Sequence, residues 1–407
     1  MNRKQIRQII RDTDYIHTSA SPEELKTAEY LKNACETMGV SANLEEFSVP
    51  VTEIKEAELY IDGEAIPCTG YRCCGSWDVE APLVYLPNTD AASLALARGK
   101  IVLLDQRFSY FVYHDLFNAG IKGIITYTGS RFYADHDIDT LELRSYVAEG
   151  KLLPCMNINA KDAFKVVKSG AKSARIHLVQ NESTGMSHNV VATLPGTTDE
   201  WVAVTAHYDT TPLSRGNYDN MTGAIALLLI MEQLKAVPLR RGLRFIFCGS
   251  EERGLLGSKA YVRDHAEELK TCTVNVNIDM IGSVMGKFIA CCSATEATVA
   301  YIKAICLEQG WGMEARQGVY SSDSTPFADA GVPGISFARL APASQAIIHT
   351  RFDTPDVLSD EQIAKDAAFI TSYVAIMADS VVCPVEKVIP DKVKTQLDEY
   401  LNRKRKE

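Results

Sequence analysis

The chain has 407 residues and a formal net charge of −10, with 46% hydrophobic and 23% charged residues. This length exceeds what one hydrophobic core usually supports, so we expect two folding units, in tandem or with one inserted in the other. The composition is that of a globular protein. It provides neither the roughly 18 consecutive apolar residues of a membrane span nor a basic face, so membranes and nucleic acid are not expected partners.

The N-terminal residues and the cysteines bear on location. The start, MNRKQIRQIIRD, is polar and helix-like and lacks the apolar centre of a secretory signal, so we expect a cytoplasmic protein. Eleven cysteines, an odd number, suit a reducing compartment better than a disulfide framework. Because none has the CxxC spacing of a thiolate zinc site, any metal must be held by histidine and carboxylate side chains.

The first part of the chain predicts a helix and then an inserted module. Residues 22–39 carry apolar side chains at helical spacing and end on Gly39, which suits a C-cap. Between 54 and 184 the pattern changes to short strands, with a strand, helix and strand unit at 99–129. In this module, His136 lies in an acidic loop that we consider a candidate for binding an adventitious cation.

Beyond residue 185 the pattern becomes regular α/β. Apolar segments predict strands at 188–196, 201–209, 243–252, 274–282, 287–293 and 334–339, and helices at 223–236, 258–269 and 297–310. Strands this apolar are buried on both faces, which indicates a mostly parallel central sheet flanked by helices. We therefore expect a discontinuous catalytic domain, a small β-rich insertion and a helical C-terminal tail, with the boundaries 1–53 and 185–383, 54–184, and 384–407.

Acidic residues and histidines gather where the predicted strands end. They are His207, Asp209, Asp219, Glu251, Glu252, Asp279 and His349. The ligand crevice of an open α/β sheet lies outside the carboxyl ends of its strands. Imidazole and carboxylate groups suit two zinc ions about 3.5 to 4 Å apart, with one carboxylate as a bridge. Five ligands would then leave positions open for water and substrate, which indicates a catalytic centre.

Two neighbouring positions suggest separate roles. Glu251 and Glu252 follow the same strand, where one side chain can bind metal while its neighbour takes a proton. Asp209 lies two residues beyond His207 on the same strand face. It is therefore suited to accept the ring N–H of a metal-bound histidine.

Five motifs occur in the order AHYDT, GNYDNMTG, FCGSEERGLLGS, NIDMIG and IIHTRFDTPD. Together they resemble the zinc-dependent di-metal peptidase family that contains the bacterial leucyl aminopeptidases, glutamate carboxypeptidase II and the transferrin receptor. The inserted module resembles the protease-associated domain found in several peptidases. The resemblance implies a phosphorylase/hydrolase-like aminopeptidase core with two Zn²⁺ per chain.

The resemblance also implies a role for each ligand. Asp219 would bridge the metals, with His207 and Asp279 completing one site and Glu252 and His349 the other. Glu251 would be the general base, and the peptide bond between Asp219 and Asn220 would be cis. Ser324 stands where family members often have a histidine, so the pocket contacts are expected to differ.

The predicted activity is that of a zinc exopeptidase acting on peptides, with an aminopeptidase as the first hypothesis. Glu251 would activate a metal-bridging water for attack on the scissile carbonyl, and Tyr320 is a candidate oxyanion donor. Arg339 and Arg351 are candidate ligands for a substrate carboxylate, which would favour a carboxypeptidase or an amidohydrolase of modified or acidic peptides. A non-catalytic, receptor-like homologue would have lost metal ligands, whereas this chain has all five. A homo-oligomer is an open possibility.

Overall fold

The computed structural model describes residues 1–105, 108–132, 138–342 and 344–405. His136, the candidate cation ligand of the inserted module, lies outside these described residues.

The chain divides into two compact units. Unit 1 consists of Met1–Val49 with Met186–Glu407, and unit 2 of Pro50–Gly185. The expected insertion, 54–184, lies within unit 2, and the C-terminal tail belongs to unit 1. Two long strands, β1 (Ala42–Ile61) and β8 (Ser173–Leu194), begin in one unit and end in the other.

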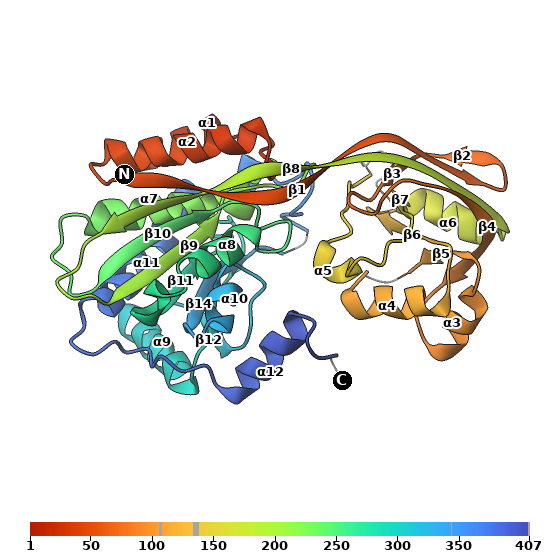
Figure 1. Ribbon diagram of the computed structural model, residues 1–407. Helices are drawn as coiled ribbons and strands as arrows, with labels where there is room; N and C mark the ends of the chain where they lie inside the picture. The colour runs from red at the N-terminus through yellow and green to blue at the C-terminus, as the bar shows by residue number, and fades with distance from the viewer. Residues whose placement is uncertain (106–107, 133–137, 343, 406–407) are drawn as a thin grey trace. The chain divides into compact units, whose positions relative to one another are not determined.

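The central sheet of unit 1 has the strand order β13-β12-β14-β11-β9-β10-β8 (Figure 1). Strand β9 pairs in parallel with β10 and β11, β14 with β11, and β13 with β12. The antiparallel pairs are β8 with β10 and β12 with β14. The predicted mostly parallel sheet is therefore confirmed. The bounds are β9 (Trp201–His207), β10 (Gly242–Cys248), β11 (Cys272–Ile278), β12 (Lys287–Ser293), β13 (Glu314–Gln317) and β14 (Gly334–Leu340).

Helices cover both faces of this sheet. Along β10, Phe245 and Phe247 join the large core cluster that contains α7 and α11, whereas Ile246 packs with Tyr261 of α8 and Phe327 of α10. This alternation follows from the two-residue period of a strand. The helices of unit 1 are α1 (Arg3–Asp12), α2 (Pro22–Thr37), α7 (Thr222–Leu234), α8 (Leu256–Asp264), α9 (Glu296–Gln309), α10 (Ser324–Asp329), α11 (Asp360–Asp379) and α12 (Asp391–Tyr400), with short turns at Asn217–Met221, Glu268–Lys270 and Pro355–Val357.

Helix α7 has no solvent-facing stripe. Its residues from Thr222 to Met231 are all buried, between the sheet and α11. A helix that is apolar on all sides must be buried on all sides, because it has no polar face to expose to water. The helix begins directly after the turn that carries Asp219, so this turn is attached to the centre of the core.

A histidine at the periphery of unit 1 contacts two glutamates. His265, which follows α8, contacts Glu268 through Nδ1 at 2.8 Å and Glu45 through Nε2 at 3.0 Å. Burial disfavours the charged ring, yet these two carboxylates raise the pKa of His265.

The expected C-terminal helix is present as α12, which buries Val393 and Leu397 in a small cluster with α10.

Unit 2 has its own apolar core. Strands β4, β5, β6 and β7 are parallel neighbours, and β3 pairs antiparallel with β7. The predicted strand, helix and strand unit at 99–129 is present as β5, α4 and β6. The bounds are β2 (Glu64–Ile66), β3 (Cys68–Gly70), β4 (Trp77–Leu86), β5 (Ile101–Leu104), β6 (Gly123–Thr128) and β7 (Cys155–Asn159), with α3 (Ala91–Ala97), α4 (Tyr110–Ala119), α5 (Ser145–Ala148) and α6 (Ala160–Ser169).

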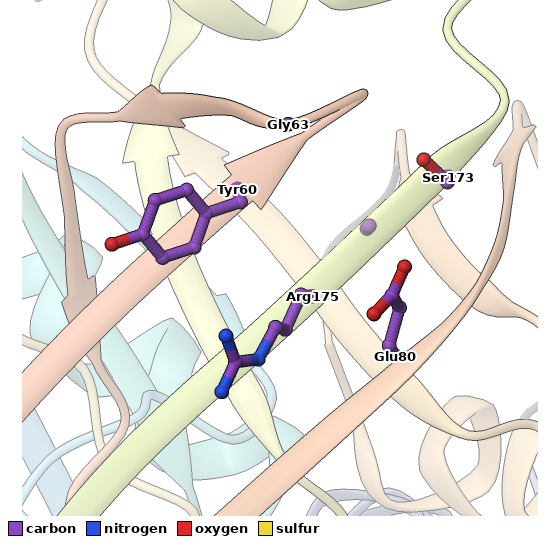
Figure 2. Close-up of a pocket in the computed structure, with 6 residues that line it drawn as sticks. Tyr60, Gly63, Glu80, Ser173 and Arg175 are labelled. Carbon is purple, nitrogen blue, oxygen red and sulfur yellow. The ribbon is translucent and has the colours of Figure 1, made fainter.

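A surface pocket lies on unit 2, and Figure 2 shows its lining of Tyr60, Gly63, Glu80, Ser173, Ala174 and Arg175. Two of its polar side chains already contact other side chains of unit 2. Arg175 pairs with Asp78 at 2.9 Å, and the Tyr60 hydroxyl donates to Glu58 at 3.0 Å. Arg175 and Tyr60 are therefore already engaged within unit 2. Among the helices of the described ranges, none combines the length and the hydropathy that a bilayer span requires.

Candidate metal centre

The predicted site residues of β9, β10 and β11 meet at one edge of the sheet. His207 is the last residue of β9, and it lies level with Cys248, the last residue of β10. Asp279 follows β11, whose Asn277 pairs with Thr205 of β9. Because parallel strands end on the same side, His207, the turn after Cys248 and Asp279 come together.

Asp219 enters this edge from the turn before α7. The peptide bond between Asp219 and Asn220 is cis, as the family resemblance implied. The buried Asn220 amide donates to the Ile278 carbonyl at 3.0 Å and accepts the N–H of Met280 at 2.9 Å and of Gly223 at 3.0 Å. Asn220 thereby fastens the Asp219 turn to the end of β11.

Asp219 is shared by two groups of ligand atoms. Its Oδ1 lies 3.1 Å from Nε2 of His207, and its Oδ2 lies 3.1 Å from Nε2 of His349. Asp279 Oδ1 lies 3.7 Å from the His207 ring, and Glu252 Oε2 lies 3.2 Å from the His349 ring. In each group, the ligand atoms lie within 4.8 Å of one another. One carboxylate thus faces two possible metal positions, with one oxygen toward each.

The electrostatics of this cluster favour bound cations. Burial raises the pKa of Asp279, and the nearby Asp219 adds to this, although His207 opposes it. Burial and Asp219 likewise raise the pKa of Glu252 to about 7. Within the described residues, Asp279 Oδ1 is buried and has no hydrogen-bond partner. Divalent cations would provide both the missing partner and the countercharge, and these nitrogen and oxygen donors suit zinc.

Glu251 lies beside the two groups. Its carboxylate can reach a common point with His207 and Glu252, but it belongs to no described group that contains Asp219. Burial raises the pKa of Glu251 well above the ordinary value; the Glu252 charge adds to this and His207 opposes it. This position leaves Glu251 available for proton transfer while Glu252 joins Asp219 and His349.

Asp209 contacts both the His207 ring and the turn that carries Glu251 and Glu252. Nδ1 of His207 lies 3.3 Å from the Asp209 carbonyl oxygen and 3.6 Å from its carboxylate, so the backbone oxygen is the nearer acceptor for the ring N–H. Its fully buried carboxylate accepts the backbone N–H of Glu251 at 2.8 Å and of Glu252 at 3.2 Å. Asp209 therefore holds the turn that carries both glutamates.

The sequence profile of peptidase family M28 matches residues 189–374, the segment that contains every residue of these groups. This segment, somewhat less than half of the chain, is therefore similar to peptidase family M28. Aminopeptidase YwaD of Bacillus subtilis is 28% identical over 304 residues, 68% of this chain and 62% of that protein. A probable leucine aminopeptidase 2 of Aspergillus fumigatus is 26% identical over 55% of this chain and 46% of its own length. The chain therefore spans less than two thirds of these curated relatives.

Solved structures agree with the M28 fold. A zinc aminopeptidase from Bacillus subtilis has a TM-score of 0.78 and 24% identity, covering 96% of this chain and 98% of that one. An aminopeptidase from an Aneurinibacillus strain has a TM-score of 0.76 and 23% identity, covering 96% of both chains. At this identity, the likeness shows the fold alone.

The candidate substrate-binding residues have different surroundings. Arg339, a candidate ligand for a substrate carboxylate, has its guanidinium paired with the buried Asp366 at 2.6 and 2.7 Å, so its role toward substrate stays a prediction. Arg351 is exposed, over the ring of Phe352. Tyr320 is half-buried, and burial together with Asp279 raises its pKa, so its hydroxyl keeps its proton.

Two supporting carboxyl groups were missed from the sequence. Glu24 of α2 is fully buried and accepts hydrogen bonds from Ser187, Ser250 and the Ala20 N–H. Glu24 follows Ser21 by three residues, which is the spacing of a helix capping box. The sequence therefore indicated a role at the start of α2 and none at the turn beside Glu251.

The second missed group is Asp353. It accepts the backbone N–H groups of Tyr218 and Asp219. The sequence signal was its place in IIHTRFDTPD, four residues after His349.

Proposed function

We propose that this chain is a two-zinc aminopeptidase, which releases residues from the N-terminus of peptides. One zinc would be held by His207, Asp219 and Asp279, and the other by Asp219, Glu252 and His349. The observation that carries the proposal is the shared Asp219, whose two oxygens each face a separate histidine within 3.1 Å. The aminopeptidase names of the M28 relatives support the choice of reaction.

The residues around the ligands suit peptide hydrolysis. When bound, the zinc ions would polarise the scissile carbonyl and lower the pKa of water toward about 7. Glu251 would accept a proton from the attacking water and deliver it to the leaving amine. Asp209 would keep Glu251 in position through its backbone N–H. The protonated hydroxyl of Tyr320 is our candidate donor to the carbonyl oxygen.

Replacing Glu251 with glutamine tests the assignment. The variant should retain the zinc content of the wild type, because Glu251 is not one of the five proposed ligands. Turnover should fall by about 10² to 10⁴, the usual contribution of a general acid–base group. Glu267→Gln, at a side chain that is 85% exposed, is the matched control. Full activity of Glu251→Gln, or loss of zinc from it, would contradict the proposed role.

The terminus that is cleaved needs a separate experiment. We expect turnover of leucine anilides and none of N-blocked dipeptides, because an aminopeptidase requires a free amino group. The reverse preference would favour a carboxypeptidase or an amidohydrolase. The pairing of Arg339 with Asp366 weakens this alternative, because it engages one of the two candidate ligands for a substrate carboxylate. A wild-type protein that binds no zinc would instead favour a non-catalytic homologue.

We further propose that unit 2 is a protease-associated domain and that the protein acts in the cytoplasm. The parallel strands β4 to β7 with their own core support an independent module, and the eleven free cysteines support a reducing compartment. Expression of residues 50–185 alone tests the first point, since a module should fold without unit 1. Cell fractionation tests the second.

A further inference from the structure

The Asp353 carboxylate connects two loops of the candidate centre. The residue is 1% exposed. Its Oδ1 accepts the N–H of Tyr218 at 2.7 Å, and its Oδ2 accepts the N–H of Asp219 at 3.1 Å and the hydroxyl of Ser214 at 3.3 Å. Both oxygens therefore hold the turn that presents the bridging carboxylate.

Asp353 also ends the loop that carries His349. The Thr350 hydroxyl donates to the Ile347 carbonyl at 2.7 Å, and the N–H of Asp353 donates to the Thr350 carbonyl at 3.1 Å. These short-range bonds make the segment a compact turn. Its position relative to Asp219 is fixed where the chain enters the core, at Asp353.

Burial restrains His349 less than it restrains the two carboxylates that face its ring. Its backbone has a φ of +60°, in the left-handed region that costs a non-glycine residue about 1 to 2 kcal/mol. Its side chain is 46% exposed, whereas those of Asp219 and Glu252 are 6% and 8% exposed. Burial therefore contributes little to the position of this ring, and the anchoring of its loop must contribute more.

The other half of the centre has a different support. His207 and Asp279 are attached to strands of the sheet. Asn220 ties the Asp219 turn to the end of β11 through two hydrogen bonds and to α7 through a third. None of these bonds involves Asp353. Loss of Asp353 should therefore affect the two halves unequally.

We propose that Asp353 is a positioning residue that fixes His349 against Asp219, and that its carboxylate supports metal binding at Asp219, Glu252 and His349 more than at His207, Asp219 and Asp279. This inference rests on the proposed two-zinc function. It assigns no contact between Asp353 and metal or substrate.

Zinc titration of the full-length Asp353→Asn variant tests the inference. The amide is close in shape but offers one acceptor oxygen to two N–H groups. In competition with a chromogenic chelator, one of two zinc equivalents should bind about 10 to 100 times more weakly than in the wild type, as is usual when a group that supports a ligand is lost. The second equivalent should stay within about threefold. Unchanged affinities, or an equal fall for both equivalents, would overturn the proposal.

Asp356→Asn is the matched control, because Asp356 is an exposed aspartate in the same segment. It should bind both zinc equivalents as the wild type does. A selective loss in this control as well would overturn the role of Asp353, since the effect would then belong to the segment's charge.

Amide hydrogen exchange of the zinc-stripped proteins provides a readout that needs no metal. A peptide covering 217–221 should exchange at least several times faster in Asp353→Asn than in the wild type or Asp356→Asn, because one of the N–H groups of Tyr218 and Asp219 loses its acceptor. Equal exchange would overturn the positioning role. A wild type that binds fewer than two zinc equivalents would refute the proposed function, while the exchange result would still decide whether Asp353 holds this turn.

Discussion

Replacing Glu24 with glutamine should stabilise the protein at alkaline pH and change its stability little in acid. Glu24 is fully buried, and burial, helped by the charge of Asp209, raises its pKa from the ordinary 4.5 to about 8. The folded protein therefore binds this proton more tightly than the unfolded chain does. The stabilisation is complete below pH 4.5 and is lost as the pH rises to about 8.

The size of this effect follows from the difference between the two pKa values. At about 1.4 kcal/mol per pH unit, the free energy of unfolding would fall by roughly 5 kcal/mol at most between pH 4.5 and 8. Glutamine is neutral at every pH, and its amide can bond to Ser187 and to the Ala20 N–H that Glu24 now contacts. The variant should therefore gain at least about 2 kcal/mol over the wild type by pH 8.5.

Urea denaturation of both proteins between pH 5 and 9 measures this difference. Both should be in the same metal state, so that titration of the metal ligands cancels. Glu23→Gln, at an exposed glutamate on the same helix, should follow the wild type. If Glu24→Gln and the wild type change in parallel over the whole range, Glu24 does not carry the raised pKa and the reasoning is refuted.

Three further predictions concern the fold and the metals. His265→Gln should lower the free energy of unfolding by about 1 kcal/mol at pH 6 and by much less at pH 9.5. The raised pKa of His265 stabilises the fold below pH 6.5, and this contribution disappears as the pH rises through the pKa of the folded state. A loss that is the same at both pH values would contradict the prediction. Leu228→Ala should cost about 2 to 5 kcal/mol in urea unfolding because the side chain is fully buried, whereas Leu307→Ala, 86% exposed, should stay within about 0.5 kcal/mol; equal effects would refute the packing assignment. Zinc at 100 times its Kd should raise the free energy of unfolding of stripped protein by about 2.7 kcal/mol per site, and an unchanged midpoint would argue against metal binding by the folded state.

The sequence was most informative where chemistry and topology coincide. His207 and Asp279 could be placed on one edge because parallel strands end together, and the structure brings them within 3.7 Å. Apolar strands and helices were recognised from their periodicity, as in β12, whose bounds match the predicted 287–293. Strand direction was not readable in this way, since an apolar segment looks the same whether it pairs parallel or, as β12 does with β14, antiparallel.

Contacts between side chains far apart in the sequence could not be predicted. Arg339 looked available for substrate, but its partner Asp366 lies on α11, a helix that no sequence argument connected to it. Glu24 and Asp353 were missed for the same reason: each accepts hydrogen bonds from residues more than one hundred positions away. A single sequence shows that a carboxylate exists, whereas its neighbours depend on the completed fold.

The direct connection between Asp219 and the buried residues Thr222–Met231 of helix α7 has a consequence for how this protein can be changed. An insertion or an enlarged side chain between Asn217 and Thr222 would have to displace the core, so few substitutions there should yield folded protein. The exposed segment around His349 borders the same centre without that restriction. Libraries aimed at new substrate preference should therefore vary residues 344–345, 347–348 and 351–352, where mutational tolerance and proximity to the proposed metal ligands occur together.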